Sequence, residues 1–260
     1  MHDADIVTYS RDMLAKLIYP VANPTFGYVF SKGFYFRADP DGFNGRVSRL
    51  LVTPLIRALQ QTLGQDEYLG YLDSFRYPLA GEFAMRSHVV GDIRIPSDWG
   101  LEIGVLSEVR RNYSNRVIAQ VDIADNYDHK HQTVSADDAS RGLSRMSVDI
   151  SKAIFRKLAT DGEIFSAEKF RTVKATYFRE ALDRIDSYYN DALMNGLTLD
   201  RHAEEATVEL FAKNIMVAGE TYLNNPMETP FLPSWNRVNA ASPDFLARYA
   251  EAVRLDNAIE

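Results

Sequence analysis

The chain contains no cysteine. Disulfide bonds, thiolate nucleophiles and cysteine-ligated zinc are therefore excluded, and the composition fits a cytoplasmic protein. Long apolar runs are also lacking, because no stretch approaches the ~18 apolar residues that a membrane-spanning helix needs. The first residues, Met1 to Asp5, are polar and acidic. We therefore expect no signal peptide.

Positive charge is scarce as well. Lys and Arg number 29 against 36 Asp and Glu, which gives a formal net charge of −7. Such a chain would repel a polyanion unless a local basic patch outweighed the rest, so nucleic acid is not an expected partner. What the chain does have is 46% apolar residues over 260 positions. This is enough for a large domain with a sizeable core, alone or with an appendage.

Hydrophobic periodicity predicts strands mainly in the first half of the chain and helices in the second. Strands are expected over 28–36 and 117–123. Helices are expected over 11–18, 44–63, 98–112, 135–159, 166–194 and 200–223, and a short one with Pro243 at its first position. Ser10 should cap the first of these helices, which should end near Pro20, and Ser135 with Asp138 resembles a capping box before the fourth. Pro54 should kink or restart the second of these helices, and Asp98 should cap the third. The proline-containing segment 224–242 is the best candidate for a linker or arm. The change of character after Thr133 predicts two regions, 1–134 and 135–260.

Two groups of polar residues could bind a divalent cation. Asp3 and Asp5 stand one residue apart, as pairs of metal-binding carboxylates often do, although a solvated terminus would look the same. His129 and His131 would lie on one face of a strand and could reach one metal ion. The alternative is a pair of surface histidines on a polar loop.

Two further motifs could bind or act on a small molecule. Glu82 and Glu102 each adjoin a glycine and could form a carboxylate pair like that of a glycosidase. Alternatively they accept hydrogen bonds in tight turns, which glycine also marks. The run Gly45-Arg46-Val47-Ser48 opens a predicted helix, where an arginine, a hydroxyl group and free backbone N–H groups can bind an anion. Ordinary helix capping is the competing interpretation.

In order and spacing, these motifs resemble the glucosyl-3-phosphoglycerate synthases, a family of retaining glycosyltransferases of GT-A fold. The resemblance covers about residues 1–160. His2-Asp3-Ala4-Asp5 resembles the family's DxD motif, Gly45–Ser48 its Gly-Arg-Val-Thr, and Pro78–Ala84 its Pro-Leu-x-Gly-Glu-Tyr-Ala. Gly100–Gly104 resembles its Gly-(Leu/Val)-Glu-Ile-Gly, and Ala119–Val121 its strand leading to a metal-binding histidine. The resemblance implies an α/β fold: a partial GT-A-type, Rossmann-like domain followed by a mostly helical C-terminal region.

The resemblance also implies roles for individual residues. Asp5 and His129 would bind Mg²⁺ or Mn²⁺. Asp3, Lys32, Gly81, Glu82 and Glu102 would contact the donor, a nucleotide-diphosphate sugar for which UDP-glucose is the first expectation. Arg46, Val47, Ser48 and His131 would hold a glycerate-type acceptor. Leu79, through its carbonyl, and Glu102 would act at the reacting centre. Retention in this family is generally explained by front-face attack, which needs no protein nucleophile.

Two departures from the family pattern are apparent. The DxD stands at residue 3, whereas in the family it follows a whole nucleotide-binding half, so we expect this chain to be a C-terminal portion lacking most of that half. A homo-oligomer or a partner chain would then supply it, and a non-catalytic fragment or split-enzyme subunit is the main alternative. His131 stands where family members can carry asparagine. This leaves the acceptor open among 3-phosphoglycerate, glycerate and another small acid. A glycoside hydrolase using Glu82 and Glu102 is a third interpretation.

Overall fold

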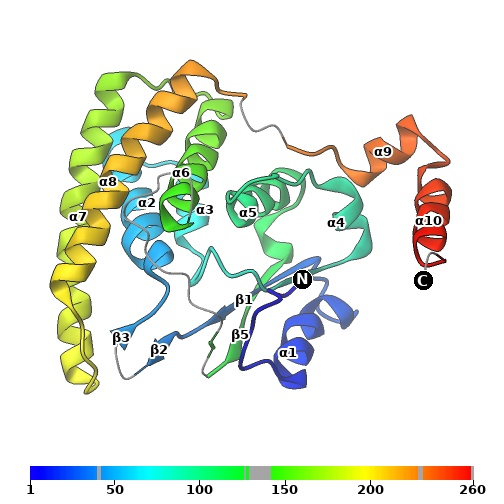
Figure 1. Ribbon diagram of the computed structural model, residues 1–260, viewed down its shortest axis with the longest axis horizontal. Coiled ribbons are helices and arrows are strands. Elements are labelled where there is room, and N and C mark those ends of the chain that lie inside the picture. Colours follow the sequence, from blue (N-terminus) through cyan, green and yellow to red (C-terminus); the bar gives the residue numbers. More distant parts are fainter. Residues whose placement is uncertain (40–41, 126, 129–141, 228–230, 259–260) are drawn as a thin grey trace.

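The computed structural model describes residues 1–39, 42–125, 127–128, 142–227 and 231–258. A small sheet forms one layer, and a larger set of helices packs over it (Figure 1). The central strand, β1 (Phe30–Tyr35), pairs antiparallel with β4 (Phe83–Met85) and parallel with β5 (Ile118–Ala124). The architecture is therefore mixed α/β with a high helical content.

The predictions for the two longer strands are confirmed. The strand β1 is almost wholly buried, with even Ser31 and Lys32 inside the protein, because it is covered on both faces and paired on both edges. In β5, Ile123 is buried while Gln120 and Asp122 are exposed, as the alternation predicts. The strand β4 was not predicted. Its three residues are too few to show a periodic pattern.

Beneath the sheet lies α1 (Arg11–Ala22), which packs on β1 and β5 (Figure 1). The Ser10 hydroxyl accepts a hydrogen bond from the amide of Met13 at 3.3 Å, which confirms the predicted N-cap. The helix was expected to end near Pro20, but it continues to Ala22. A proline in the last turn removes only one backbone hydrogen bond, so that turn can still form.

The remaining elements are mostly helices. They are β2 (Ala38–Asp39), β3 (Gly42–Phe43), the π-helix η1 (Val47–Val52), α2 (Thr53–Leu63), α3 (Glu67–Asp73), α4 (Ser87–Asp92), α5 (Leu101–Asn112), the 3₁₀ turn η2 (Asn115–Val117), α6 (Gly142–Thr160), α7 (Ala167–Met194), α8 (Arg201–Asn224), α9 (Trp235–Ala241) and α10 (Phe245–Asp256). The predicted helices over 166–194 and 200–223 agree with α7 and α8 to within one residue at each end. The one predicted over 135–159 ends at Thr160, and its predicted start lies outside the described residues. The capping box proposed at Ser135 and Asp138 lies outside the described residues.

Local signals explain where the two longest helices begin. Ser166 accepts a hydrogen bond from the amide of Lys169 at the start of α7, and Asp200 accepts one from Ala203 at the start of α8.

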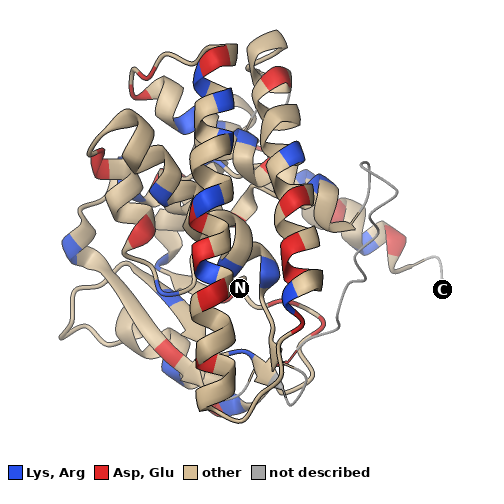
Figure 2. Cartoon of the chain, turned by 90° about the vertical axis from the view of Figure 1, so that its left-hand side faces the viewer, with Lys and Arg blue, Asp and Glu red and all other residues tan. Residues whose placement is uncertain are grey.

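Acidic and basic residues are interspersed along the helices in the foreground of Figure 2. The stretch from Asn44 to Leu63 divides as expected into two helices, with Pro54 in the first turn of α2.

Two starts differ from prediction. Gly100, not Asp98, occupies the cap position of α5. The Asp98 side chain instead accepts a hydrogen bond from the Gly100 amide at 3.0 Å, one step before the helix. The helix α10 begins at Phe245 after Asp244, so Pro243 precedes the helix and does not occupy its first position. Both differences arise because a turn of one or two residues separates the signal residue from the first helical residue.

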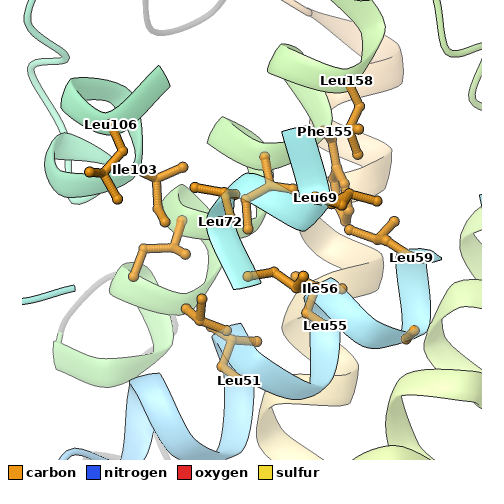
Figure 3. Packing of buried hydrophobic residues seen from close by; sticks show 14 of the residues in the cluster. Leu51, Leu55, Ile56, Leu59, Leu69, Leu72, Ile103, Leu106, Phe155 and Leu158 are labelled. Carbon is orange, nitrogen blue, oxygen red and sulfur yellow. The ribbon is translucent and has the colours of Figure 1, made fainter. Parts of the chain in front are cut away.

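The main hydrophobic core joins segments from both halves of the chain. Figure 3 shows residues of η1, α2, α3 and α5 meeting Phe155 and Leu158 of α6. The helix α8 packs along both α6 and α7, and α7 also packs on α2. A second, smaller core lies between α1 and the sheet, around Met13, Leu17 and Ile123. No helix in the described part of the chain is long and apolar enough to cross a membrane.

The segment predicted as a linker or arm contains structure of its own. Leu232 forms an isolated antiparallel bridge with Ile95, and α9 packs near α4. The chain thus crosses from the end of α8 to the far side of the molecule, where α9 and α10 lie apart from the long helices (Figure 1). Neither of these two helices has a buried residue.

Candidate active site

A cavity of about 810 Å³ lies where the sheet, the loops that follow it and the long helices meet. Its wall gathers segments that are far apart in the sequence. The residues that line it are Asp3, Ala4, Asp5, Arg37, Gly42, Phe43, Asn44, Gly45, Arg46, Val47, Ser48, Tyr77, Leu79, Trp99, Glu102, Leu143, Met146, Ile150, Leu199, Asp200, Ala203 and Glu204. Seven of the residues singled out from the sequence therefore share one cavity: Asp3, Asp5, Arg46, Val47, Ser48, Leu79 and Glu102.

One wall of the cavity is the turn that leads into η1. Gly45 has a φ of 73°, and a Cβ atom there would lie 2.8 Å from the hydroxyl oxygen of Tyr77. Only glycine fits this turn without strain. The turn presents Arg46, which is exposed, next to Ser48, which is buried. The Ser48 hydroxyl has no hydrogen-bond partner in the described part of the chain. An exposed guanidinium beside a buried hydroxyl group is suited to an anionic ligand.

A buried ion pair holds this turn against α8. Glu204 accepts hydrogen bonds from both terminal nitrogens of Arg49, at 2.8 and 3.0 Å. The same guanidinium donates to the carbonyls of Phe43 and Asn44 at 2.9 and 3.0 Å. The Nε atom of Arg46 lies 3.8 Å from Glu204. Arg49 is thus fully engaged, whereas the one ionic contact of Arg46 with the described residues is a loose one.

A second wall is the loop from Tyr77 to Glu82. Lys32 is buried on β1 and donates a hydrogen bond from Nζ to the carbonyl of Ala80. Burial lowers the pKa of Lys32 to about 8, although the nearby carboxylates of Glu102, Glu82 and Asp3 oppose this effect. Lys32 therefore both fixes the loop and supplies a positive charge beneath it.

Glu82 lies behind this loop and does not line the cavity. It is fully buried, and its carboxylate accepts hydrogen bonds from the hydroxyls of Tyr35 and Tyr127 at 2.8 and 2.6 Å. The rings of the two tyrosines stack with centroids 3.6 Å apart. The amide of Asp3 also donates to Glu82, at 3.3 Å. The proposed carboxylate pair of Glu82 and Glu102 is therefore not formed in the cavity, because tyrosines enclose one member.

Glu102 does line the cavity, in the first turn of α5. Burial raises its pKa, and the positive charge of Lys32 acts in the opposite direction. Leu79 lines the cavity from the adjoining loop. Lys32 and Gly81, by contrast, lie behind the cavity wall. Donor contacts for Lys32, Gly81 and Glu82 remain predictions.

The acidic pair near the start of the chain is folded onto the same loop. A Cβ atom on Gly81 would lie 2.1 Å from a carboxylate oxygen of Asp3, so this position must be glycine for Asp3 to occupy its place. Both Asp3 and Asp5 line the cavity. Carboxylate oxygens are the ligands that Mg²⁺ and Mn²⁺ prefer, so the pair fits such an ion chemically.

The remaining predicted metal ligand, His129, is not among the residues that the structure describes. Nor is His131, so their metal and acceptor roles stay predictions. Within the part of the chain that the structure describes, no group of three or more His, Cys, Asp or Glu side chains could hold a metal ion. The two aspartates would therefore need at least one further ligand.

Sequence comparison identifies related proteins. No protein-family model matches the chain. It is 46% identical to a glucosyl-3-phosphoglycerate synthase of Persephonella marina over 257 residues, which are 99% of this chain and 63% of that protein. It is 43% identical to a synthase of the same name from Methanococcoides burtonii, over 98% of this chain and 63% of that protein. The chain belongs to the glucosyl-3-phosphoglycerate synthase family. It spans about 63% of the length of these two relatives.

The fold of this chain is similar to that of a solved structure. Mannosyl-3-phosphoglycerate synthase from Rubrobacter xylanophilus is 27% identical, with a TM-score of 0.51, over 64% of this chain and 47% of that one. The family resemblance predicted from the motifs is thus confirmed. So is the prediction that the chain corresponds to only part of a family member's length.

Several cavity residues were not found by sequence reasoning. Glu204 and the apolar residues of α6 lie in the cavity wall although they stand far along the chain from the other motifs. No local pattern marks them, because helix-forming segments carry the same residue types on any buried face. Trp99 could have been found, since it directly precedes the Gly100–Gly104 motif. Arg37 follows β1, and no sequence motif marks it.

Proposed function

We propose that this chain carries the acceptor-binding and catalytic part of a retaining glycosyltransferase of GT-A type. The reaction is transfer of a glucosyl unit from a nucleotide-diphosphate sugar, with UDP-glucose as the first candidate, to 3-phosphoglycerate or a similar glycerate acceptor. The observation that supports this most strongly is the shared cavity. It gathers an acidic pair, the loop residue Leu79 with the half-buried Glu102, and an exposed arginine beside a buried hydroxyl group.

The acceptor would bind at the turn that leads into η1. Arg46 can form a charge-assisted contact to a phosphate or carboxylate group, and Ser48 can donate the hydrogen bond that its hydroxyl lacks in the described structure. Glu204 does not compete strongly for Arg46, because Arg49 satisfies its carboxylate. His131 would complete this acceptor site.

The donor sugar would lie between the loop carrying Leu79 and the first turn of α5. Glu102 would accept hydrogen bonds from sugar hydroxyls. A divalent cation held by Asp5 and His129 would neutralise charge on the departing nucleotide diphosphate. Asp3 would lie next to the same group. The Glu82 carboxylate accepts a hydrogen bond from the Asp3 amide, and Gly81 leaves room for the Asp3 side chain. This arrangement needs no protein nucleophile.

Two alternatives remain distinct from this proposal. The chain spans 63% of its relatives' length, which leaves room for the interpretation that it is a non-catalytic fragment or a subunit of a split enzyme. A glycoside hydrolase that uses Glu82 and Glu102 is disfavoured. Glu82 is enclosed by two tyrosine hydroxyls and is not exposed to the cavity.

The test is an assay of the 260-residue chain with UDP-glucose, 3-phosphoglycerate and Mg²⁺, with the glucosylated product detected by mass. Arg46→Lys keeps the charge but loses the planar fork, so the acceptor KM should rise about tenfold while the donor KM changes little.

Arg57→Lys is the matched control. Arg57 also has a side chain exposed by 45% and an ionic contact of 3.8 Å, but it lies outside the cavity. An unchanged acceptor KM in the Arg46 variant would contradict the acceptor assignment. Sugar release to water without an acceptor would favour a hydrolase. No turnover by the chain alone, with turnover restored by a longer protein or a partner chain, would favour the split-enzyme interpretation.

A further inference from the structure

Two arginines line the cavity, Arg46 and Arg37. Arg37 follows β1, and its backbone is paired with the turn that carries Arg46. Its carbonyl accepts a hydrogen bond from the amide of Asn44 at 3.0 Å. The neighbouring β2–β3 pair, in which Ala38 lies opposite Phe43, continues the same antiparallel register. Arg37 therefore lies across from Asn44, two residues before Arg46.

Unlike Arg49, Arg37 does not use every side-chain nitrogen in a hydrogen bond to the described residues. Its guanidinium lies over the ring of Tyr127, 5.9 Å from the centroid. Its Nε atom is buried and has no hydrogen-bond partner among the described residues. A buried N–H group without a partner is costly, and a ligand atom that accepts its hydrogen bond would remove that cost. Arg49, by contrast, uses all three of its side-chain nitrogens.

The position of Arg37 indicates which part of a ligand it would meet. Tyr127, beneath it, donates to Glu82, and Glu82 accepts from the amide of Asp3. Arg37 thus lies on the side of the cavity that carries the proposed reacting centre. In 3-phosphoglycerate the carboxylate is bonded directly to the carbon that bears the free hydroxyl group. The phosphate lies two atoms further away. The carboxylate is therefore the anionic group nearer to the reacting atom.

We propose, resting on the proposed function, that Arg37 binds the acceptor's carboxylate while Arg46 and Ser48 bind its phosphate. The planar guanidinium matches a carboxylate through two parallel hydrogen bonds. The local charge agrees, because Glu204 neutralises Arg49 and leaves Arg37 and Arg46 for the ligand. The cavity would therefore select small acids that carry two anionic groups, and Arg37 would be the residue that recognises the second one.

The test is calorimetric binding of two compounds to the 260-residue chain without donor. These are 3-phosphoglycerate and glycerol 3-phosphate, which lacks the carboxylate. Arg37→Met should weaken binding of 3-phosphoglycerate tenfold or more and leave binding of glycerol 3-phosphate within about twofold. Arg46→Met should weaken binding of both. Arg37→Lys should give a smaller, equally selective loss, because it keeps the charge without the fork.

Arg76→Met is the matched control, since Arg76 also stacks on an aromatic ring, that of Phe34 at 4.7 Å, but does not line the cavity. It should leave both affinities unchanged. Equal weakening of both compounds by Arg37→Met, or no weakening of either, would overturn the assignment of the carboxylate to Arg37. Failure of 3-phosphoglycerate to bind the native chain would overturn it too. Glucosyl transfer is measured in parallel, so loss of the carboxylate contact and absence of the proposed reaction are distinguished.

Discussion

Lys32 of β1, buried inside the protein, donates a hydrogen bond to the carbonyl oxygen of Ala80. This contact joins the central strand to the loop from Tyr77 to Glu82. In that loop Leu79, the residue before Ala80, lines the cavity. Elements packed on the two faces of the sheet bury the side chains of β1, so Lys32 cannot reach water. Its charge is tolerated because Glu102, Glu82 and Asp3 surround it. The loop and the charge balance of the site therefore depend on one lysine.

Lys32→Met should change how stability varies with pH. Burial lowers the pKa of Lys32 from 10.5 to about 8. Between these two values the unfolded chain holds more protons than the folded chain, so the free energy of unfolding should rise with pH in this window. The rise attributable to Lys32 is on the order of 3 kcal/mol at most.

Urea unfolding at pH 7.5, 8.25 and 9 checks this expectation, because only about a tenth of each tyrosine in the unfolded chain is ionised at pH 9. The Met variant should lose the rise, whereas Lys16→Met, at an exposed position of α1, should keep it. A rise of equal size in the Lys32 variant would show that another group causes the pH dependence.

Gly45→Ala should damage both stability and acceptor binding. The residue has a φ of 73°, and a Cβ atom would lie 2.8 Å from the Tyr77 hydroxyl oxygen. Gly196→Ala is the control, since Gly196 has a similar φ of 69° but nothing within 4 Å of the added atom. The control should cost about 1–2 kcal/mol, the usual price of a left-handed conformation. The Gly45 variant should cost more and raise the acceptor KM. Equal losses of stability, measured by urea unfolding, would mean that Tyr77 moves aside freely.

Glu204→Gln should destabilise the protein through Arg49. The variant leaves a guanidinium that is 12% exposed without its carboxylate, and removing one partner of a buried pair typically costs about 3–5 kcal/mol. Arg179→Met is the comparison, because Arg179 pairs with Asp183 at the surface and should contribute less than about 1 kcal/mol. The double variant Arg49→Met with Glu204→Gln should recover part of the loss. Additive losses in this double-mutant cycle would contradict the coupling.

Asp5→Asn should weaken divalent-metal binding, because it removes one of the carboxylates expected to hold the ion. His129→Ala should do the same, while His131→Ala should chiefly weaken acceptor binding. Titration of Mn²⁺ into each variant, with and without nucleotide sugar, measures the difference. Metal binding that survives in the His129 variant and disappears in the His131 variant would place the ligand two residues further along the chain.

Much of the secondary structure could be predicted because its signals are local. Ser10, Ser166 and Asp200 each cap a helix through an amide three residues ahead. The alternation from Val117 to Ile123 corresponds to β5. The short elements β4 and α9 were not predicted, since three to seven residues contain too little of a period to be recognised.

Five motifs in fixed order identify the family, because together they are specific even when each is weak alone. They also indicate which residues could bind anions or metal. How the chain packs in three dimensions sets which of these residues face a common cavity. Glu82 and Glu102 look alike in sequence, yet hydrogen bonds from Tyr35 and Tyr127 enclose the first and leave the second in the cavity wall.

The contact between Arg49 and Glu204 likewise joins positions 155 residues apart. Such pairings depend on how helices and strands pack over the whole chain, and burial then sets whether a carboxylate supports the fold or meets a ligand.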